Sequence, residues 1–179
     1  MKICIVGAGA IGGFLGGRIS QLEEVEVSAL ARGETLEALK KYGWRLKTKG
    51  KLISSYVKAS ENTEDFAEQD LVIIAVKGPA LVDIADIIKP LIGKDTIILP
   101  AINGVPWWFL EHCSNISNSL LESVNPKSKI SNAIPSKNLL GVVVHAAASR
   151  IEPGIISHNM GNGLIIGEPT GGKSERVEQ

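Results

Sequence analysis

The chain has 179 residues, of which 44% are hydrophobic and 21% are charged, a composition typical of a soluble globular protein with room for a substantial core. Lysine plus arginine and aspartate plus glutamate balance at 19 each, so no overall field favours nucleic acid or an anionic membrane. Cys4 and Cys113 lie far apart, and no apolar run approaches the roughly 18 residues of a membrane span. We therefore expect a cytoplasmic protein without a disulfide framework.

The first hundred residues alternate between strand patterns and helix patterns. Short β-branched runs are typical of buried parallel strands, and apolar residues spaced three or four apart predict the helices between them. The expected strands are 3–6, 25–30, 70–76 and 96–99, the expected helices are 10–20, 34–41 and 79–88, and residues 44–48 and 52–57 form an expected hairpin. This alternation predicts an α/β protein with a Rossmann-type, doubly wound, mostly parallel sheet.

The sequence changes in character after Asn103. Residues 112–138 are rich in serine, asparagine, lysine and proline, and we expect an excursion with short helical pieces there. Two or three further strands are expected, at 141–148, 154–158 and 163–166. We interpret them as extra C-terminal edge strands of the same sheet.

A glycine-rich loop follows the first expected strand and opens the first expected helix. It matches the pattern G-x-G-x-x-G, in which Gly7 permits the tight turn, Gly9 lets the backbone approach a pyrophosphate, and Gly12 lets the helix pack closely. We predict that the loop binds a dinucleotide at the helix N-terminus. The competing interpretation is a turn whose glycines serve packing alone. The residues that we assign to cofactor binding here are Gly7, Ala8, Gly9, Ala10, Ile11 and Gly12.

The second expected strand leads into Arg32 rather than into an acidic residue. A site selective for NAD carries Asp or Glu near this position, to accept a hydrogen bond from the ribose 2′-hydroxyl. A guanidinium instead binds a 2′-phosphate through two charge-assisted hydrogen bonds, so we predict NADPH as the cofactor. Two alternatives stay open: Arg32 is an ordinary solvated charge, or the nearby Glu34 is the acidic partner of an NAD site.

Two more polar residues follow expected strands. Lys77 comes after the strand at 70–76, and Asn103 comes after the strand at 96–99. Taken singly, each suits a solvated strand end or a turn. Because ligands bind beyond the carboxyl ends of strands in open α/β sheets, we predict that both join the glycine loop in one site.

A second phosphate-binding pattern occurs near the end of the chain. Residues 167–174 read GEPTGGKS and fit the P-loop pattern G-x-x-x-x-G-K-[ST]. A working P-loop needs a following helix and further strands to hold magnesium, and the sequence stops soon after Ser174. We interpret the match as a short pattern without its context. The three histidines have no metal-ligand spacing, so we predict no metal site.

Several motifs together resemble one family. GAGAIGG at 7–13, LAR at 30–32, AVK at 75–77 and ING at 102–104 come in the order and spacing of the ketopantoate reductases (2-dehydropantoate 2-reductases). HAAAS at 145–149, EPG at 152–154 and IGEP at 166–169 continue the resemblance, which covers nearly the whole chain. That family reduces ketopantoate with NADPH to pantoate, on the route to pantothenate and coenzyme A.

The resemblance implies a role for each candidate residue. The three glycines of the loop would hold the pyrophosphate and Arg32 the 2′-phosphate. Lys77 would lie beside the cofactor, and Asn103 would reach the nicotinamide ribose and the substrate, which makes it the one catalytic candidate in this chain. The implied partner is a small 2-oxo acid, with no nucleic acid and no membrane.

The sequence departs from the family pattern in two ways. The family's general-acid lysine and substrate-binding glutamate lie in a helical C-terminal domain that has no counterpart here. We therefore expect a dinucleotide-binding domain at 1–167, the start of a linker at 168–179, and a fragment that binds NADPH but turns over little or nothing. A homodimer formed through the further domain is a related expectation. The segment Pro106-Trp107-Trp108 and the excursion after it are longer than in compact members, so the 2-oxo acid and the role of the two tryptophans stay open.

Three rival interpretations remain. An NAD-dependent two-domain dehydrogenase of another family would share the glycine loop. A non-enzymatic dinucleotide-sensing module would bind the cofactor without a substrate. A P-loop protein would instead bind Mg-ATP through residues 167–174.

Overall fold

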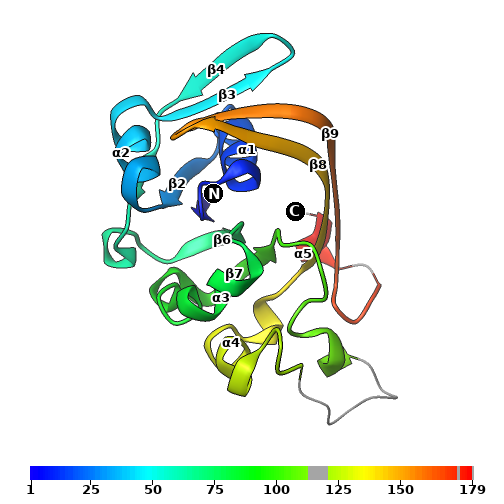
Figure 1. The fold of residues 1–179 in the computed structure, drawn as a ribbon. Helices are drawn as coiled ribbons and strands as arrows, with labels where there is room; N and C mark the ends of the chain where they lie inside the picture. The colour runs from blue at the N-terminus through cyan, green and yellow to red at the C-terminus, as the bar shows by residue number, and fades with distance from the viewer. Residues whose placement is uncertain (113–120, 173, 179) are drawn as a thin grey trace.

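Five parallel strands form the central sheet in the computed structural model, which describes residues 1–112, 121–172 and 174–178 (Figure 1). Each neighbouring pair of strands in this sheet is parallel. The order across the sheet is β5 (Lys58–Ser60), β2 (Glu26–Leu30), β1 (Lys2–Val6), β6 (Gln69–Ile74) and β7 (Ile92–Pro100). Taken along the chain, these strands follow the order 3-2-1-4-5 of a doubly wound nucleotide-binding sheet. The predicted Rossmann-type fold is confirmed.

Alternate side chains of the central strands enter two separate cores. Ile3 and Ile5 of β1 belong to one core, and Cys4 and Val6 belong to the other, because successive side chains of a strand point to opposite faces. Burial on both faces explains why these strands are nearly continuous hydrophobic runs. The Cys4 thiol is fully buried, and this burial raises its pKa to about 11, so the residue acts as a small hydrophobe.

Helices cover both faces of the central sheet. α1 (Ala10–Ile19) and α2 (Gly33–Tyr42) contribute to the first core, whereas α3 (Gly78–Ile84) and α4 (Lys129–Ala133) contribute to the second. A single helical turn, α5 (Glu175–Glu178), lies near the end of the chain. Short 3₁₀ turns occur at Thr63–Asp65, Lys89–Leu91, Phe109–His112, Pro126–Ser128 and Ser136–Asn138. The expected excursion does contain short helical pieces, although its residues 113–120 lie outside the described part.

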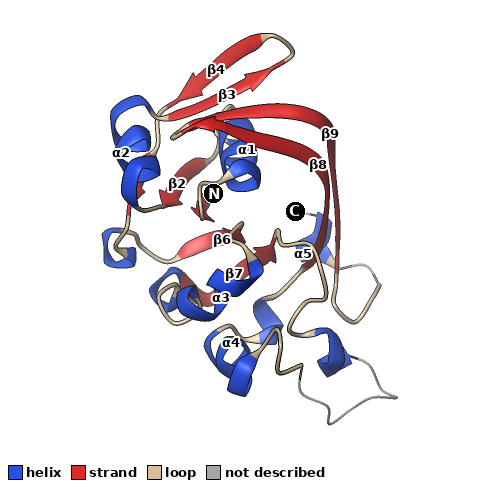
Figure 2. Cartoon of the chain, viewed as in Figure 1, coloured by secondary structure: helices blue, strands red, loops and turns tan. Residues whose placement is uncertain are grey.

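A second sheet of four strands packs over the first core, with α1 between the two sheets (Figure 2). Its order is β4 (Lys51–Ser55), β3 (Trp44–Thr48), β9 (Ile155–Gly167) and β8 (Gly141–Glu152). β3 and β4 form the predicted antiparallel hairpin, and β8 and β9 form a second, longer one. Parallel pairing of β3 with β9 joins the two hairpins into one sheet.

The prediction that the C-terminal strands extend the edge of the central sheet is wrong. Beyond its pairing with β6, β7 forms a bridge with Leu139 in the described part of the chain, and the chain then turns into β8. The glycine-rich face of α1 explains the alternative docking. A Cβ on Gly16 would lie 2.5 Å from the Trp44 ring, and one on Gly17 would lie 3.0 Å from Leu46. Without those side chains, the second sheet can pack closely on the helix.

β9 also runs through two segments that the sequence predicts as separate strands. Gly161 has a φ of +71° and lies where the register with β8 shifts, between His145 and Ala147. A Cβ on Gly161 would collide with the carbonyl oxygen of His145. The glycine therefore permits a bulge, and the strand continues past it instead of ending.

Candidate functional site

One row of residues marks the carboxyl edge of the central sheet. The strand register places Leu30, Val6, Ile74 and Pro100 side by side across β2, β1, β6 and β7. Neighbouring strands lie about 4.8 Å apart, so this row spans roughly 14 Å. The connections reverse direction between β1 and β6, and open α/β sheets bind ligands at such a switch point.

The predicted site residues leave the sheet just beyond this row. Gly7 follows the row by one residue, Arg32 by two, and Lys77 and Asn103 by three each. Residues that are up to about a hundred positions apart in sequence therefore lie along the carboxyl edge of the central sheet. This is the arrangement that the sequence predicts from the strand ends alone.

The three glycines of the first loop meet different physical demands. Gly7 has a φ of +91°, and its N–H donates to the Leu30 carbonyl at 3.0 Å. A Cβ on Gly12 would collide with the carbonyl oxygen of Gly7, so the residue at position 12 must be glycine for packing. A Cβ on the exposed Gly9 would meet nothing within 4 Å. Only Gly9 therefore faces open space, as an approach by a ligand phosphate requires.

The start of α1 completes this loop. Ala8 is buried, and Ala10 and Ile11, the first residues of the helix, are half-buried. The first turn of α1 holds no acidic residue, and the first N–H groups of a helix lack intrahelical acceptors. Backbone donors and the positive end of the helix dipole thus meet beside Gly9, which fits a pyrophosphate.

Two exposed cations lie farther along the edge. Arg32 and Lys77 occupy the N-cap positions of α2 and α3. Within the described ranges, neither side chain forms a hydrogen bond or an ion pair. Glu34, the alternative acidic partner, is exposed in the first turn of α2 and makes no ion pair with Arg32. Both cations are therefore available to an anionic ligand.

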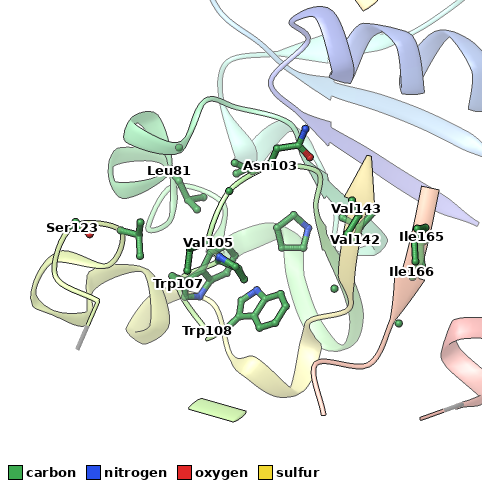
Figure 3. Close-up of a pocket in the computed structure, with 18 of the residues that line it drawn as sticks. Leu81, Asn103, Val105, Trp107, Trp108, Ser123, Val142, Val143, Ile165 and Ile166 are labelled. Carbon is green, nitrogen blue, oxygen red and sulfur yellow. The ribbon is translucent and has the colours of Figure 1, made fainter. Parts of the chain in front are cut away.

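Asn103 is one of the residues that line an apolar cavity of about 620 Å³. The exposed Asn103 is followed by Gly104, whose φ of +113° turns the chain sharply. Figure 3 shows Leu81 on one side of the cavity, Val143 on the other and Trp108 between them. A ligand held at the sheet edge would therefore have an apolar space directly beside it.

Sequence reasoning did not predict this cavity. Its walls come from α3, from the segment after Asn103, and from the ends of β8 and β9 that lie far along the chain. Aliphatic residues in strands carry no local sign that they line a cavity. The one available signal was the tryptophan pair: Trp107 is buried in the second core, and the half-buried Trp108 lines the cavity.

Comparison with known proteins assigns the chain to a family. Residues 3–171 match the family model described as ketopantoate reductase PanE/ApbA. The chain belongs to the ketopantoate reductase family. A 2-dehydropantoate 2-reductase from Mesorhizobium japonicum is 37% identical over 178 residues, which cover 99% of this chain and 55% of that protein.

Solved structures of ketopantoate reductases give the same assignment. A crystal structure assigned as a ketopantoate reductase from Ralstonia solanacearum has a TM-score of 0.94 and 45% identity, covering 98% of this chain and 55% of that one. A 2-dehydropantoate 2-reductase from Geobacter metallireducens has a TM-score of 0.78 at 24% identity, covering 99% and 52%, and shows the shared fold. The chain thus spans about half the length of these ketopantoate reductases.

Membership in the ketopantoate reductase family implies a nicotinamide dinucleotide as the class of cofactor. The glycine loop and the two free cations at the sheet edge are compatible with such a ligand. Among the described residues, no helix is both long enough and apolar enough to cross a membrane.

In the second glycine pattern, at residues 167–174, the hydrogen bonds centre on a carboxylate. Glu168 accepts hydrogen bonds from the Ser174 hydroxyl at 2.5 Å and from the Arg176 guanidinium at 2.7 Å. Arg176 is the main cause that lowers the pKa of Glu168 to about 2, and Ser174 adds to it. A carboxylate that is hydrogen-bonded to the serine of the pattern opposes phosphate binding there. Lys173 lies outside the described residues.

Proposed function

We propose that residues 1–179 form the NADPH-binding half of an oxidoreductase that reduces a small 2-oxo acid. We propose reduction of 2-dehydropantoate to pantoate, a step of pantothenate and coenzyme A biosynthesis and the reaction for which its relatives are named, as one reaction of this class that the protein performs. The observation that carries this proposal is the alignment of Gly9, Arg32, Lys77 and Asn103 along one edge of the Rossmann sheet. Each is a residue that core packing does not require, and together they match the parts of a dinucleotide.

The chemistry of each residue fits one task. The open backbone at Gly9 and the N-terminus of α1 would hold the pyrophosphate, and Arg32 would hold the 2′-phosphate. The bound cofactor would supply a hydride to the keto carbon. Lys77 would add positive charge beside the cofactor. The Asn103 amide, which can both donate and accept hydrogen bonds, would position the nicotinamide ribose and the substrate.

Reduction also requires a proton for the oxygen of the keto group. The family resemblance assigns this proton to a lysine of a helical C-terminal domain, which also carries a substrate-binding glutamate. We propose that residues 168–179 begin the linker to that domain. The part of the reaction that residues 1–179 would perform is cofactor binding and orientation of the substrate.

Arg32→Ala tests the cofactor assignment. Loss of the charge-assisted hydrogen bonds to the 2′-phosphate should weaken NADPH binding by about 10- to 100-fold, while NADH binding should change by less than about twofold. Both dissociation constants can be measured by isothermal titration calorimetry. Arg150→Ala, which removes an exposed arginine from β8 in the second sheet, is the matched control and should change neither constant.

The outcomes separate the two cofactor assignments. A large loss confined to NADPH supports the proposed 2′-phosphate contact. Unchanged NADPH affinity in Arg32→Ala, with tight NADH binding that Glu34→Ala abolishes, would instead support an NAD-dependent dehydrogenase.

A further inference from the structure

We propose that the apolar cavity beside Asn103 receives the side chain of the 2-oxo acid, and that the protein prefers 2-oxo acids whose side chain is large and apolar. This inference rests on the proposed function and extends it by naming the class of side chain: branched aliphatic or aromatic. We call the cavity the Trp108 pocket. Its lining includes Leu81, Val82, Val105, Trp108, Val143 and Ile165.

The Trp108 pocket lies at the carboxyl ends of β6 and β7. Its lining includes three exposed residues, Asn103 after β7 and Gly78 and Pro79 after β6. These strands lie on the opposite side of the switch point from Arg32, which follows β2. If the 2′-phosphate lies at Arg32, the reactive end of the dinucleotide lies toward the pocket. A substrate held at Asn103 would then direct its side chain into the Trp108 pocket.

The walls of the Trp108 pocket are mostly apolar. Among the described residues that line the pocket, the polar side chains are Asn103, Ser123, Glu168 and the two tryptophans, whose indole N–H groups are buried away from solvent. Asn103 and Ser123 are exposed, and the Glu168 carboxylate already accepts hydrogen bonds from Arg176. A buried hydroxyl without a partner is costly, so this interior favours a hydrocarbon over the hydroxyl-bearing side chain of 2-dehydropantoate.

The Trp108 pocket is also larger than a short side chain needs. A volume of about 620 Å³ lies within the range of cavities that enclose a whole small-molecule ligand. A short side chain would leave most of the apolar wall in contact with water. Each added methylene that replaces this water should raise the affinity about fourfold. The half-buried Trp108 ring and the exposed Val105 offer the flat and branched surfaces that an aromatic or branched group would contact.

The test compares 2-oxo acids of increasing side-chain size on the full-length protein that carries residues 1–179, at saturating NADPH. The series is pyruvate, 2-oxobutanoate, 4-methyl-2-oxopentanoate and phenylglyoxylate, with 2-dehydropantoate as the reference. We expect kcat/KM to rise about fourfold per added methylene and to be higher for the two largest acids than for 2-dehydropantoate. Isothermal titration of the corresponding 2-hydroxy acids, in the presence of NADP, should show the same order of dissociation constants.

Val105→Trp tests whether the pocket is the cause. This exposed wall residue can be enlarged without changing either core, and the new ring should partly fill the Trp108 pocket. We expect the ratio of kcat/KM for phenylglyoxylate to that for pyruvate to fall by at least about tenfold. Phe109→Ala is the matched control, because Phe109 is an exposed aromatic of the same segment outside the pocket lining. That variant should leave the ratio unchanged.

Failure of this inference can be distinguished from failure of the proposed function. A protein that does not bind NADPH contradicts the proposed function, and the inference falls with it. If NADPH binds and 2-dehydropantoate is reduced faster than every apolar acid, the proposed function stands and the inference is wrong. The inference is also wrong if Val105→Trp lowers kcat/KM for all acids equally, as expected if another part of the protein fills the pocket.

Discussion

Gly9 and Gly12 belong to one loop, yet the structure gives them separate roles that can be tested separately. Gly9→Ala places a methyl group in open space, so the free energy of unfolding should change by less than about 0.5 kcal/mol. The same methyl group would block the approach of a pyrophosphate, and NADPH affinity should fall at least about tenfold. Denaturant titration and calorimetry measure the two effects.

Gly12→Ala should show the opposite pattern in stability. Its Cβ would collide with the carbonyl oxygen of Gly7, and such overpacking costs about 1–3 kcal/mol. Comparable stability losses in both variants, with no effect of Gly9→Ala on NADPH binding, would show that the loop serves packing alone. The comparison therefore distinguishes the two interpretations that the motif leaves open.

For single residues, the sequence predicts where a residue lies in the fold better than it predicts what that residue contacts. Gly7, Arg32, Lys77 and Asn103 were all placed at strand ends, and the structure brings them to one edge because parallel strands share their direction. Whether Arg32 contacts a 2′-phosphate stays a prediction. Trp108 stood out only as an unusual residue, since its role depends on neighbours that lie far away in the chain.

The helix α1 is the element that joins the two sheets, and its glycines make this contact possible. Gly16→Ala should push against the Trp44 ring, which lies 2.5 Å from the new Cβ position. Overpacking costs about 1–3 kcal/mol, partly offset by the roughly 1 kcal/mol that alanine gains over glycine in a helix. Urea unfolding should therefore show a net loss of stability. Gly9→Ala, whose Cβ would meet nothing within 4 Å at the N-cap of the same helix, is the matched control and should change stability by less than about 0.5 kcal/mol.

The connection between β9 and α5 depends on the ion pair of Glu168 and Arg176. Hydrogen bonds from Arg176 lower the pKa of Glu168 from its ordinary value of 4.5 to about 2. The stabilisation is therefore fully present above about pH 4.5 and is lost as the pH falls toward 2. Glu168→Gln removes the ionised carboxylate and with it this pH-dependent stabilisation. The variant should therefore be less stable at neutral pH and should lose less stability on acidification. Unfolding at a series of pH values measures the difference, and parallel curves for the two proteins would refute the assignment.

At the scale of the whole molecule, the chain is about half as long as the ketopantoate reductases that it matches. We predict that the isolated fragment 1–179 binds NADPH but reduces 2-dehydropantoate slowly or not at all, because the proposed proton donor lies outside it. Calorimetry measures binding, and the loss of NADPH absorbance measures turnover. Measurable turnover by the fragment would contradict this prediction. Binding with no turnover even in the full-length protein would instead support a dinucleotide-sensing module.

Local patterns were enough to predict four strands of the central sheet (β1, β2, β6 and β7) and the glycine loop, whereas the short edge strand β5 was not predicted. A β-branched run such as Ile3–Val6, followed by glycines at fixed spacing and a helix pattern, depends on residues that are close in sequence. Strand order then follows from short right-handed connections. The family resemblance rests on the same local motifs, and the match over residues 3–171 confirms it.

The tertiary structure alone decided where β8 and β9 pair and how the Trp108 pocket forms. Pairing with β3 depends on how closely Trp44 and Leu46 approach the glycine face of α1, and the pocket depends on where α3, Trp108 and β8 meet. Both outcomes are set by the shapes of side chains brought together from distant parts of the chain, and no local periodicity records those shapes.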